Sequence, residues 1–402
     1  MFNNANVYVS FGDDYKSLTV RCEITFNTPV NDFSFSLSTL LTIDHIMPDT
    51  KSEWHIIKEW QPQWQHKSNE VKVSSKTPMQ ELTIEYHGQI AGWCNIIEER
   101  RIALSSYSAW TIFETSVPVS FLFKLCNMED YFVINARYDR TEKIWMYGET
   151  EQHDVGNIIA LKKGSYHVAN TGNFYFYYLD EAEKEYADCY VSNYGGIMDY
   201  FISIFGKRDI NKMSVVSLDL DKPGGAYFRD ELMVIDKIDV SEDKEKIRQS
   251  VIGLLGHELG HNWFTGADTT TWEDWLNETG AEWAALLYIL SLNDTEFFEK
   301  QLSRSKENYK DTPIIRSSDG KRPVDGVHTR GVMMFYEIYL RYGIEKMITI
   351  LKTFINLEEK TTANFLSELR IKMGNEIPDK IERGLTIKDY SKLLDENAMR
   401  IG

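Results

Sequence analysis

Hydrophobic and polar residues alternate in short runs through the first part of the chain, from residue 6 to about residue 178. The runs are rich in β-branched and aromatic residues, and turn-forming residues separate them, which is typical of an all-β region. The clearest runs are residues 17–28, 32–46, 81–86, 131–138 and 173–179. We therefore predict an N-terminal β-sandwich domain over residues 1–178.

The pattern changes after residue 179, where apolar residues begin to recur at helical spacing. It predicts a helix over residues 180–206, a buried strand over 212–220 and a second strand over 226–236. A further helix is predicted over residues 293–310, a polar loop over 311–325, and amphipathic helices from residue 344 onward. The fold class is therefore α+β, with more than one domain.

One predicted helix carries the residues with the clearest chemistry, His257, Glu258 and His261. Because the two histidines are four residues apart, their imidazoles lie on one helix face and can bind a single zinc ion. Glu258 then lies beside the metal without binding it, which is the place of a general base for water at the metal. The alternative is a helix in which these residues occur together by chance. The apolar positions of the helix are Ile247, Val251, Leu254, Leu255, Leu259 and Trp263.

The start and the glycines of this helix allow two further predictions. Ser241 is a good N-cap, and acidic residues follow it in the first turn. Gly253, Gly256 and Gly260 recur at intervals of three and four, although each glycine costs about 1 kcal/mol relative to alanine in a helix. Close packing of another helix or strand beside the metal would offset that cost.

A second helical pattern begins at Trp275 and offers Glu278 as a carboxylate ligand. Two histidines and one glutamate leave the fourth position of a catalytic zinc site open. Glu282 lies one turn further on, where it can accept the outer N–H of a ligand imidazole. The alternative for Glu282 is a solvent-exposed carboxylate on the helix face. Thr271 or Asn277 is expected to cap this helix.

At these two segments, residues 257–264 and 275–283, the sequence resembles the gluzincin metallopeptidases. The match is specifically to the membrane alanyl aminopeptidase family and its short bacterial relatives. Sixteen residues separate His261 from Glu278, where eighteen are typical of the family, and a loop can absorb that difference. The resemblance implies one Zn²⁺ per chain in a thermolysin-like catalytic domain over residues 179–310. It also implies a helical C-terminal region over residues 311–402 that completes the active site.

The resemblance further implies a role for His328. In the family a Tyr-x-Lys-Gly motif lies at this place, and its tyrosine donates a hydrogen bond to the oxyanion. Here His328 stands in the tyrosine position and Arg330 in the lysine position. A histidine can donate an N–H in the same way, as in the thermolysin group. The alternative is a surface or capping histidine.

The segment before the zinc helix is the candidate for peptide binding. In the family, a glycine-containing edge strand pairs with the substrate backbone, and its glutamate binds the free amine. Here the glycines are present and that glutamate is not, which argues against strict aminopeptidase specificity. The alternative is an ordinary Pro-Gly-Gly turn. The predicted substrate-binding residues are Gly224, Gly225, Ala226 and Tyr227.

Residues 105–110 lie where the β domain of the family can send a loop toward the substrate. The alternative is that the tyrosine and tryptophan of this segment belong to the core.

The composition narrows the possible partners and locations. The chain has 402 residues, of which 43% are apolar and 26% charged, values typical of a soluble globular protein. Its net charge of −17 argues against nucleic acid and anionic membranes as partners, although acidity also serves solubility.

Four scattered cysteines fit buried free thiols in a reducing compartment. No signal peptide or membrane span is predicted, so we expect a cytoplasmic protein.

The sequence thus predicts a zinc metallopeptidase in which Glu258 is the general base and His328 stabilises the oxyanion. Two alternatives remain. The same site could hydrolyse a non-peptide carbonyl or an epoxide, or the chain could be a catalytically idle protein that binds peptides. The intact Glu258 argues against the idle protein, because a degenerate site should lose its base before its ligands. Substrate sequence, oligomeric state and pathway are not determined by the sequence.

Overall fold

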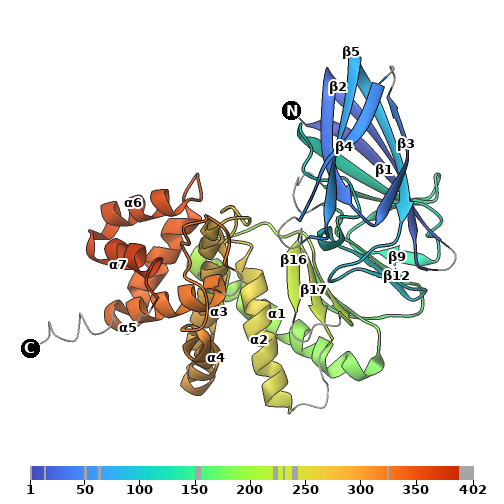
Figure 1. Ribbon diagram of the computed structural model, residues 1–402. Coiled ribbons are helices and arrows are strands. Elements are labelled where there is room, and N and C mark those ends of the chain that lie inside the picture. Colours follow the sequence, from blue (N-terminus) through green and yellow to red (C-terminus); the bar gives the residue numbers. More distant parts are fainter. Residues whose placement is uncertain are drawn as a thin grey trace, which may run out of the picture. The chain divides into compact units, whose positions relative to one another are not determined.

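The chain forms two compact units that interleave along the sequence. The structure is a computed structural model that describes residues 2–12, 15–48, 52–61, 65–149, 155–220, 225–229, 231–237, 243–323 and 326–388 (Figure 1). The first unit comprises Met1–Val168, Tyr177–Glu181 and Ser214–Ile238, and the second comprises Ala169–Phe176, Ala182–Met213 and Asp239–Gly402. The three-domain division predicted from the sequence stays a prediction.

The first unit contains an eight-stranded sheet with the order β10-β11-β8-β1-β2-β5-β3, and β4 also pairs with β5 (Figure 1). β1 and β8 are parallel, whereas β1–β2 and β2–β5 are antiparallel. The strands are β1 (Asn3–Phe11), β2 (Leu18–Ser38), β3 (Leu41–Pro48), β4 (Ser52–Trp60), β5 (Ser68–Gly88), β8 (Val119–Leu125), β10 (Arg137–Asp139) and β11 (Ile144–Glu149). The predicted runs 17–28 and 32–46 divide differently in the structure, because β2 continues through both until a turn at residues 39–40.

A smaller sheet with the order β6-β7-β12-β9 shares one hydrophobic core with the large sheet. Val7 and Phe35 contribute to this core from the large sheet, and Leu104 and Val133 from the small one. Two sheets that bury their facing sides in one core form a sandwich, so the α+β class with an N-terminal β domain is confirmed. The strands are β6 (Ile96–Ile97), β7 (Arg101–Leu104), β9 (Tyr131–Val133) and β12 (Ile158–Lys162).

The predicted strand over residues 131–138 is wrong as a single element. It forms β9 and β10, which belong to different sheets. Asn135 lies between them with a φ of 58°, a left-handed conformation that an extended strand does not allow.

The third sheet has the order β13-β14-β15-β17-β16. Its strands are β13 (His167–Thr171), β14 (Phe174–Tyr178), β15 (Met213–Leu218), β16 (Ala226–Arg229) and β17 (Leu232–Asp236). The run 226–236 was predicted as one strand, but it folds back on itself, because Glu231 has a φ of 64° and ends the extended segment. β16 therefore pairs antiparallel with β17 and ends the strand order of this sheet.

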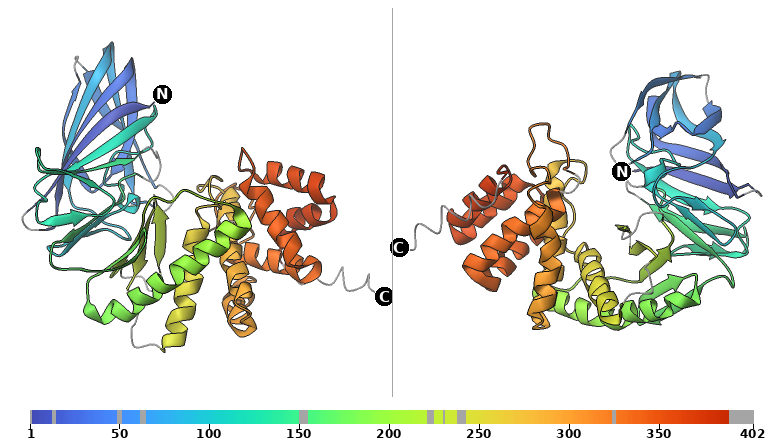
Figure 2. Two further views of the ribbon diagram at one scale, coloured as in Figure 1. Left: turned by 180° about the vertical axis from the view of Figure 1, so that it is seen from behind. Right: turned by 60° about the horizontal axis from the view of Figure 1, so that its bottom comes forward.

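The second unit is mainly helical (Figure 2). Its helices are α1 (Lys184–Phe205), α2 (Lys244–Gly260), α3 (Trp275–Ser291), α4 (Thr295–Asn308), α5 (Gly326–Ile355), α6 (Thr362–Met373) and α7 (Glu376–Gly384). α2 begins later than predicted: Asp243 is the N-cap and accepts a hydrogen bond from the Glu245 backbone N–H, while Ser241 lies outside the described residues. Of the two proposed caps for α3, Thr271 caps the short 3₁₀ turn Trp272–Asp274 that leads into it.

Three fully buried tryptophans organise the core of the second unit. Each indole N–H has an acceptor: Trp263 donates to the Gly206 carbonyl at 3.0 Å, Trp275 to Thr362 Oγ1 at 2.8 Å and Trp283 to the Val332 carbonyl at 3.1 Å. The rings therefore bury a large apolar area without leaving a donor unsatisfied. Trp275 and Trp283 lie on α3, which fixes the helix that carries Glu278 and Glu282.

The four cysteines are free, as expected, but only Cys22 and Cys94 are buried, whereas Cys126 and Cys189 are half-buried. The prediction of four buried thiols is therefore wrong for two of them, because Cys126 follows the end of β8 and Cys189 occupies a partly exposed position of α1. None of the described helices combines the length and apolar character needed to cross a bilayer. The cytoplasmic location stays a prediction.

Candidate metal centre

Close packing of α2 against α3 brings the predicted ligands together. A Cβ atom on Gly256 would lie 3.1 Å from the Ala285 Cβ, and one on Gly260 would lie 3.0 Å from the Ala281 Cα. Both distances are tighter than ordinary contacts, so the glycines allow the two helix backbones to approach. This confirms the packing predicted from the glycine spacing. It also offsets the low helix propensity of glycine at these positions.

His257, His261 and Glu278 form a triangle of ligand atoms. The Nε2 atoms of the two histidines are 3.2 Å apart, and each lies 3.4 Å from Oε2 of Glu278. Atoms that bind one zinc ion at roughly 2.0–2.1 Å in tetrahedral geometry lie about 3.3–3.4 Å from one another. The three side chains therefore already have the spacing of three zinc ligands, and they account for three of the four positions of a tetrahedral centre.

The outer nitrogens of both imidazoles face acceptors. Nδ1 of His261 lies 3.1 Å from the Phe264 carbonyl oxygen, which can accept its hydrogen. Nδ1 of His257 lies 3.5 Å from Oε1 of Glu282, a contact longer than a good hydrogen bond. A hydrogen on each Nδ1 leaves the Nε2 lone pairs free for a metal. Glu282 thus lies where the sequence predicted an outer partner of a ligand imidazole.

Several carboxylates surround the two histidines, and a bound cation would stabilise this arrangement. Burial by itself lowers the pKa of His257, but the nearby carboxylates, Glu282 and Glu278 first among them, raise that pKa to about 9. Burial likewise opposes the ionisation of Glu278, yet His328 and His261 hold its pKa well below the usual range. Oε2 of Glu278 is buried and has no hydrogen-bond partner among the described residues. An unsatisfied buried carboxylate oxygen is costly, and a divalent cation would satisfy it.

Glu258 is buried, with 6% of its surface exposed. It precedes Leu259 in the last turn of α2, and its negative charge contributes to the raised pKa values of His257 and His261. Glu258 is thus a buried acid that directly follows the candidate ligand His257 in the last turn of α2. This position fits the predicted general base.

His328 lies in the first turn of α5 and joins the same cluster. Its Nδ1 is 3.5 Å from Oε1 of Glu282 and 3.6 Å from Oε2 of Glu278, and 39% of its side chain is exposed. Burial opposes its protonation, but Glu278 and Glu282 raise its pKa. The ring is thus held at the edge of the metal triangle, with part of its surface open to a substrate.

His257, Glu282 and His328 could also enclose a cation as a second set of ligands. If both sets held a cation at once, His257 would bind through both ring nitrogens, and this requires loss of the second ring proton. We therefore assign Glu282 as an acceptor and not as a ligand.

Two residues of the site were missed by the sequence interpretation, Arg322 and Asp274. Arg322 contacts Asp274 through Nε and lies 3.3 Å from Oε1 of Glu278 through Nη2. Arg322 belongs to the segment predicted only as a polar loop, and Asp274 resembles any acidic residue at a helix start. No spacing rule connects them to Glu278, so the sequence contained no signal for this contact.

The predicted substrate-binding residues lie in the first unit, apart from Gly224, which is outside the described residues. Gly225 precedes β16, and its carbonyl accepts the backbone N–H of Asp236 at 2.8 Å. Tyr227 is buried, and its ring packs edge-on against Trp93 and Tyr107. Tyr227 thus supports the strand from within the core of the first unit.

The segment 105–110 packs within the first unit, and the substrate-facing role considered for it stays a prediction. Trp110 is fully buried, and its indole N–H donates to the Gly156 carbonyl at 2.8 Å, so this residue belongs to the core. Tyr107 lies in the 3₁₀ turn Ser106–Ser108, is half-buried and packs on Tyr227.

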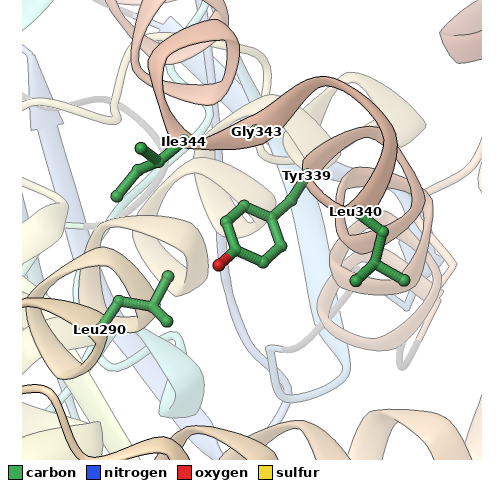
Figure 3. Close-up of a pocket in the computed structure, with 5 residues that line it drawn as sticks. All are labelled: Leu290, Tyr339, Leu340, Gly343 and Ile344. Carbon is green, nitrogen blue, oxygen red and sulfur yellow. The ribbon is translucent and has the colours of Figure 1, made fainter.

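A surface hollow of about 460 Å³ lies elsewhere on the second unit (Figure 3). It opens where Gly343, with a φ of 77°, interrupts α5, and its lining residues are Leu290, Tyr339, Leu340, Gly343 and Ile344. Leu290 is twelve residues beyond Glu278 on α3, which is about 18 Å along a helix. The hollow is therefore separate from the metal cluster, and Tyr339 belongs to the hollow.

No protein-family model and no curated protein sequence matches the chain. The solved structures that share its fold include three of yeast leukotriene A4 hydrolase. Native leukotriene A4 hydrolase from Saccharomyces cerevisiae matches with a TM-score of 0.68 and 12% identity, over 95% of this chain and 67% of that one.

A second native yeast LTA4 hydrolase structure gives a TM-score of 0.65 with 13% identity, over 94% of this chain and 66% of that one. The yeast LTA4 hydrolase complex with bestatin gives a TM-score of 0.64 with 13% identity, over 96% of this chain and 66% of that one. The chain thus spans about two thirds of the length of these structures. At this identity the likeness shows the fold.

Proposed function

We propose that the chain is a zinc-dependent peptidase whose centre is formed by His257, His261 and Glu278. The observation that carries this proposal is the triangle of Nε2, Nε2 and Oε2 atoms with sides of 3.2, 3.4 and 3.4 Å. Its edges match those of a tetrahedral zinc site with one open position, the arrangement of catalytic zinc. The shared fold of the yeast leukotriene A4 hydrolases supports a hydrolase of this kind.

The residues present fit the metal. They supply two imidazole nitrogens and one carboxylate, and the outer nitrogen of each histidine faces an oxygen, 3.1 Å away for His261 and 3.5 Å away for His257. A zinc ion bound here would act as a Lewis acid toward a substrate carbonyl and would lower the pKa of water.

The chain's own groups then divide the work of hydrolysis. Glu258 takes a proton from the attacking water and passes it to the leaving amine, because it is a buried acid that directly follows the ligand residue His257 in α2. His328 donates a ring N–H to the carbonyl oxygen as negative charge develops on it. Glu282 lies 3.5 Å from Nδ1 of both His257 and His328, so one carboxylate orients a ligand and the oxyanion donor.

Peptide binding is proposed for the backbone of β16. This strand ends the order of its sheet, so only one of its two edges pairs with a neighbouring strand of that sheet. An extended peptide can add to such an edge through main-chain hydrogen bonds. The glutamate that binds a free amine in the resembled family is absent from residues 224–228, so we propose that a free N-terminus is not strictly required.

A non-peptide substrate is the second candidate. The structural neighbours are named for the hydrolysis of leukotriene A4, and the same centre could act on another carbonyl or an epoxide. The third candidate is a protein that binds peptides without cleaving them.

The first experiment is therefore a measurement of zinc content, followed by hydrolysis of a fluorogenic peptide library by the metal-loaded protein.

We expect one zinc per chain, and peptide cleavage that a chelator abolishes and added zinc restores. Zinc binding without cleavage of any peptide, but with turnover of an epoxide or ester, would favour the second candidate. Peptide binding without turnover would favour the third. Absence of bound zinc at saturating concentration would contradict the proposal.

A further inference from the structure

Arg322 is a nearly buried arginine beside the candidate metal centre. Only 11% of its side chain is exposed, and it meets two buried carboxylates, Asp274 through Nε and Glu278 through Nη2 at 3.3 Å. A buried guanidinium is costly unless its charge is compensated, so the position of this side chain is determined by those partners.

The contact with Arg322 divides the two oxygens of Glu278 between different partners. Oε1 accepts the hydrogen bond from Arg322, whereas Oε2 lies 3.4 Å from Nε2 of both His257 and His261. A carboxylate can bind a metal through one oxygen or through both. Arg322 thus engages Oε1, and Oε2 is the oxygen that faces both imidazoles.

Asp274 anchors Arg322 from the other side. Its Oδ1 accepts a hydrogen bond from Nδ2 of Asn277 at 2.8 Å, and its Oδ2 contacts Arg322. Asn277 is fixed in turn, since its side chain bonds the backbone N–H of Ala267 at 3.1 Å and the carbonyl of the same residue at 3.0 Å. The anchor therefore consists of buried, mutually hydrogen-bonded groups with little freedom to move.

The backbone also holds the segment that carries Arg322. Lys321 forms an isolated antiparallel bridge with Thr271, and the Trp272 N–H lies 3.4 Å from the Gly320 carbonyl oxygen. The loop before α5 is thus attached beside the 3₁₀ turn that precedes α3. This attachment places the guanidinium at the first turn of α3, where Glu278 lies.

We propose that Arg322 is a positioning residue that sets the zinc affinity and the coordination of Glu278. The inference rests on the proposed zinc centre and goes beyond it, because it assigns a role to a residue that does not touch the metal. Without Arg322, the Glu278 carboxylate can rotate and offer both oxygens, and the negative charges of Asp274 and Glu278 oppose each other without the cation between them. Outer partners of metal ligands typically contribute roughly ten- to a hundredfold to metal affinity.

The test measures the zinc dissociation constant by competition with a chromophoric chelator. The variants are Arg322→Met, which removes the cation, Arg322→Lys, which keeps a single charge, and Asp274→Asn, which weakens the anchor. We expect Arg322→Met to bind zinc roughly ten- to a hundredfold more weakly than the parent, and Arg322→Lys and Asp274→Asn to lie in between. Glu278→Ala gives the reference for a lost ligand.

Arg330→Met is the matched control. Arg330 is also a buried arginine, but it donates to backbone carbonyl oxygens, those of Thr312 at 2.8 Å and of Ile387 and Lys388 at 3.1 Å each. Its replacement should lower thermal stability and leave the zinc dissociation constant near the parental value. Equal losses of zinc affinity in Arg322→Met and Arg330→Met would mean that Arg322 acts only on the fold.

A spectroscopic signature separates positioning from simple loss of charge. Substitution with Co²⁺ reports coordination number, because four-coordinate centres absorb visible light more strongly than five-coordinate ones. We expect the parent to show the stronger absorption and Arg322→Met the weaker one, as Glu278 binds through both oxygens. An unchanged zinc dissociation constant and spectrum in folded Arg322→Met would overturn the inference.

Arg322→Met could fail to fold, and the other two variants then test the inference. If both Arg322→Lys and Asp274→Asn bind zinc as tightly as the parent, the inference about Arg322 is wrong. A parent protein that binds no zinc would overturn the proposed function, and this outcome is distinct from a zinc-binding parent whose Arg322 variants match it.

Discussion

Nδ1 of His328 lies 3.5 Å from Oε1 of Glu282. The same oxygen lies 3.5 Å from Nδ1 of His257, so one carboxylate faces the proposed metal ligand and the candidate oxyanion donor together. Glu282 is 46 residues from His328 in the sequence (328 − 282), and the first turn of α5 must pack beside α3 to form this contact. The pairing ties the orientation of His328 to the metal centre.

We predict that His328→Ala lowers the rate constant for hydrolysis by roughly a hundredfold or more. Loss of an oxyanion donor typically costs about 2.7–4 kcal/mol of transition-state stabilisation. KM should change less than kcat, because the bond strengthens only as the oxyanion forms. Steady-state kinetics check this, with His87→Ala as the control for an exposed histidine on β5.

A partial recovery of kcat in His328→Tyr would support the donor role. An unchanged kcat in His328→Ala would show that another group stabilises the oxyanion. Tyr336 is engaged elsewhere, since its hydroxyl donates to Glu299 at 3.4 Å.

Glu258→Gln should keep its zinc and lose nearly all hydrolysis. The amide preserves the shape of the side chain but cannot accept a proton from water. Elemental analysis confirms the metal content, and thermal unfolding confirms that the variant is folded. Substantial turnover by the zinc-loaded variant would show that Glu258 is not the general base.

The protein should cleave N-terminally acetylated peptides in addition to peptides with a free amine. The prediction rests on the absence from residues 224–228 of the glutamate that binds the amine in the resembled family. Matched pairs of free and acetylated peptides of one sequence, compared by kcat/KM, provide the measurement. Complete refusal of every acetylated peptide would mean that a different acid binds the amine.

Gly331→Ala should destabilise the second unit by roughly 1–3 kcal/mol, the usual cost of overpacking a core. A Cβ on Gly331 would overlap the side chain of Thr279, whose Oγ1 donates to the Val327 carbonyl at 3.0 Å next to the metal ligand Glu278. The comparison is Gly195→Ala on α1, where the added carbon meets no atom of the described residues within 4 Å apart from its chain neighbours and the backbone of its own helix.

Gly195→Ala is expected to stabilise the protein by about 0.4–1 kcal/mol. Urea unfolding of both variants gives the two free energies. Equal unfolding midpoints for Gly331→Ala and the parent would show that α5 and α3 can separate without cost.

Stability should fall as the pH rises above about 10. Burial raises the pKa values of Tyr86, Tyr186, Tyr190 and Tyr227 in the folded chain, whereas in the unfolded chain these phenols ionise near their ordinary pKa of about 10. The unfolded state therefore binds fewer protons above that pH. The contribution of these tyrosines to the free energy of unfolding is fully present below a pH of about 10. Above that pH the free energy of unfolding decreases by about 1.4 kcal/mol per pH unit for each such tyrosine.

Urea unfolding at a series of alkaline pH values measures this slope. Tyr227→Phe should reduce this slope by the contribution of one tyrosine, about 1.4 kcal/mol per pH unit. The hydroxyl of Tyr227 is buried and has no hydrogen-bond partner among the described residues, so its removal should not destabilise the protein at neutral pH. A slope that is the same in parent and variant would contradict the assignment.

The sequence by itself determined the elements whose geometry is local. The spacing of four between His257 and His261 fixes their shared face, because an α-helix returns to the same side after about four residues. The glycines of α2 likewise predicted a close neighbouring helix or strand, and alternating residues predicted the β domain. These inferences hold because each depends only on the repeat of a helix or a strand.

Only the tertiary structure decided which distant groups complete the site. The contact between Arg322 and Glu278 spans 44 residues and depends on the path of a loop that has no repeat of its own. The division of 226–236 into β16 and β17 depends on one residue, Glu231, in a left-handed conformation that sequence pattern does not reveal. A hydrogen bond or turn of this kind is set by the whole packed structure, since many polar residues of the same type could have occupied the same positions.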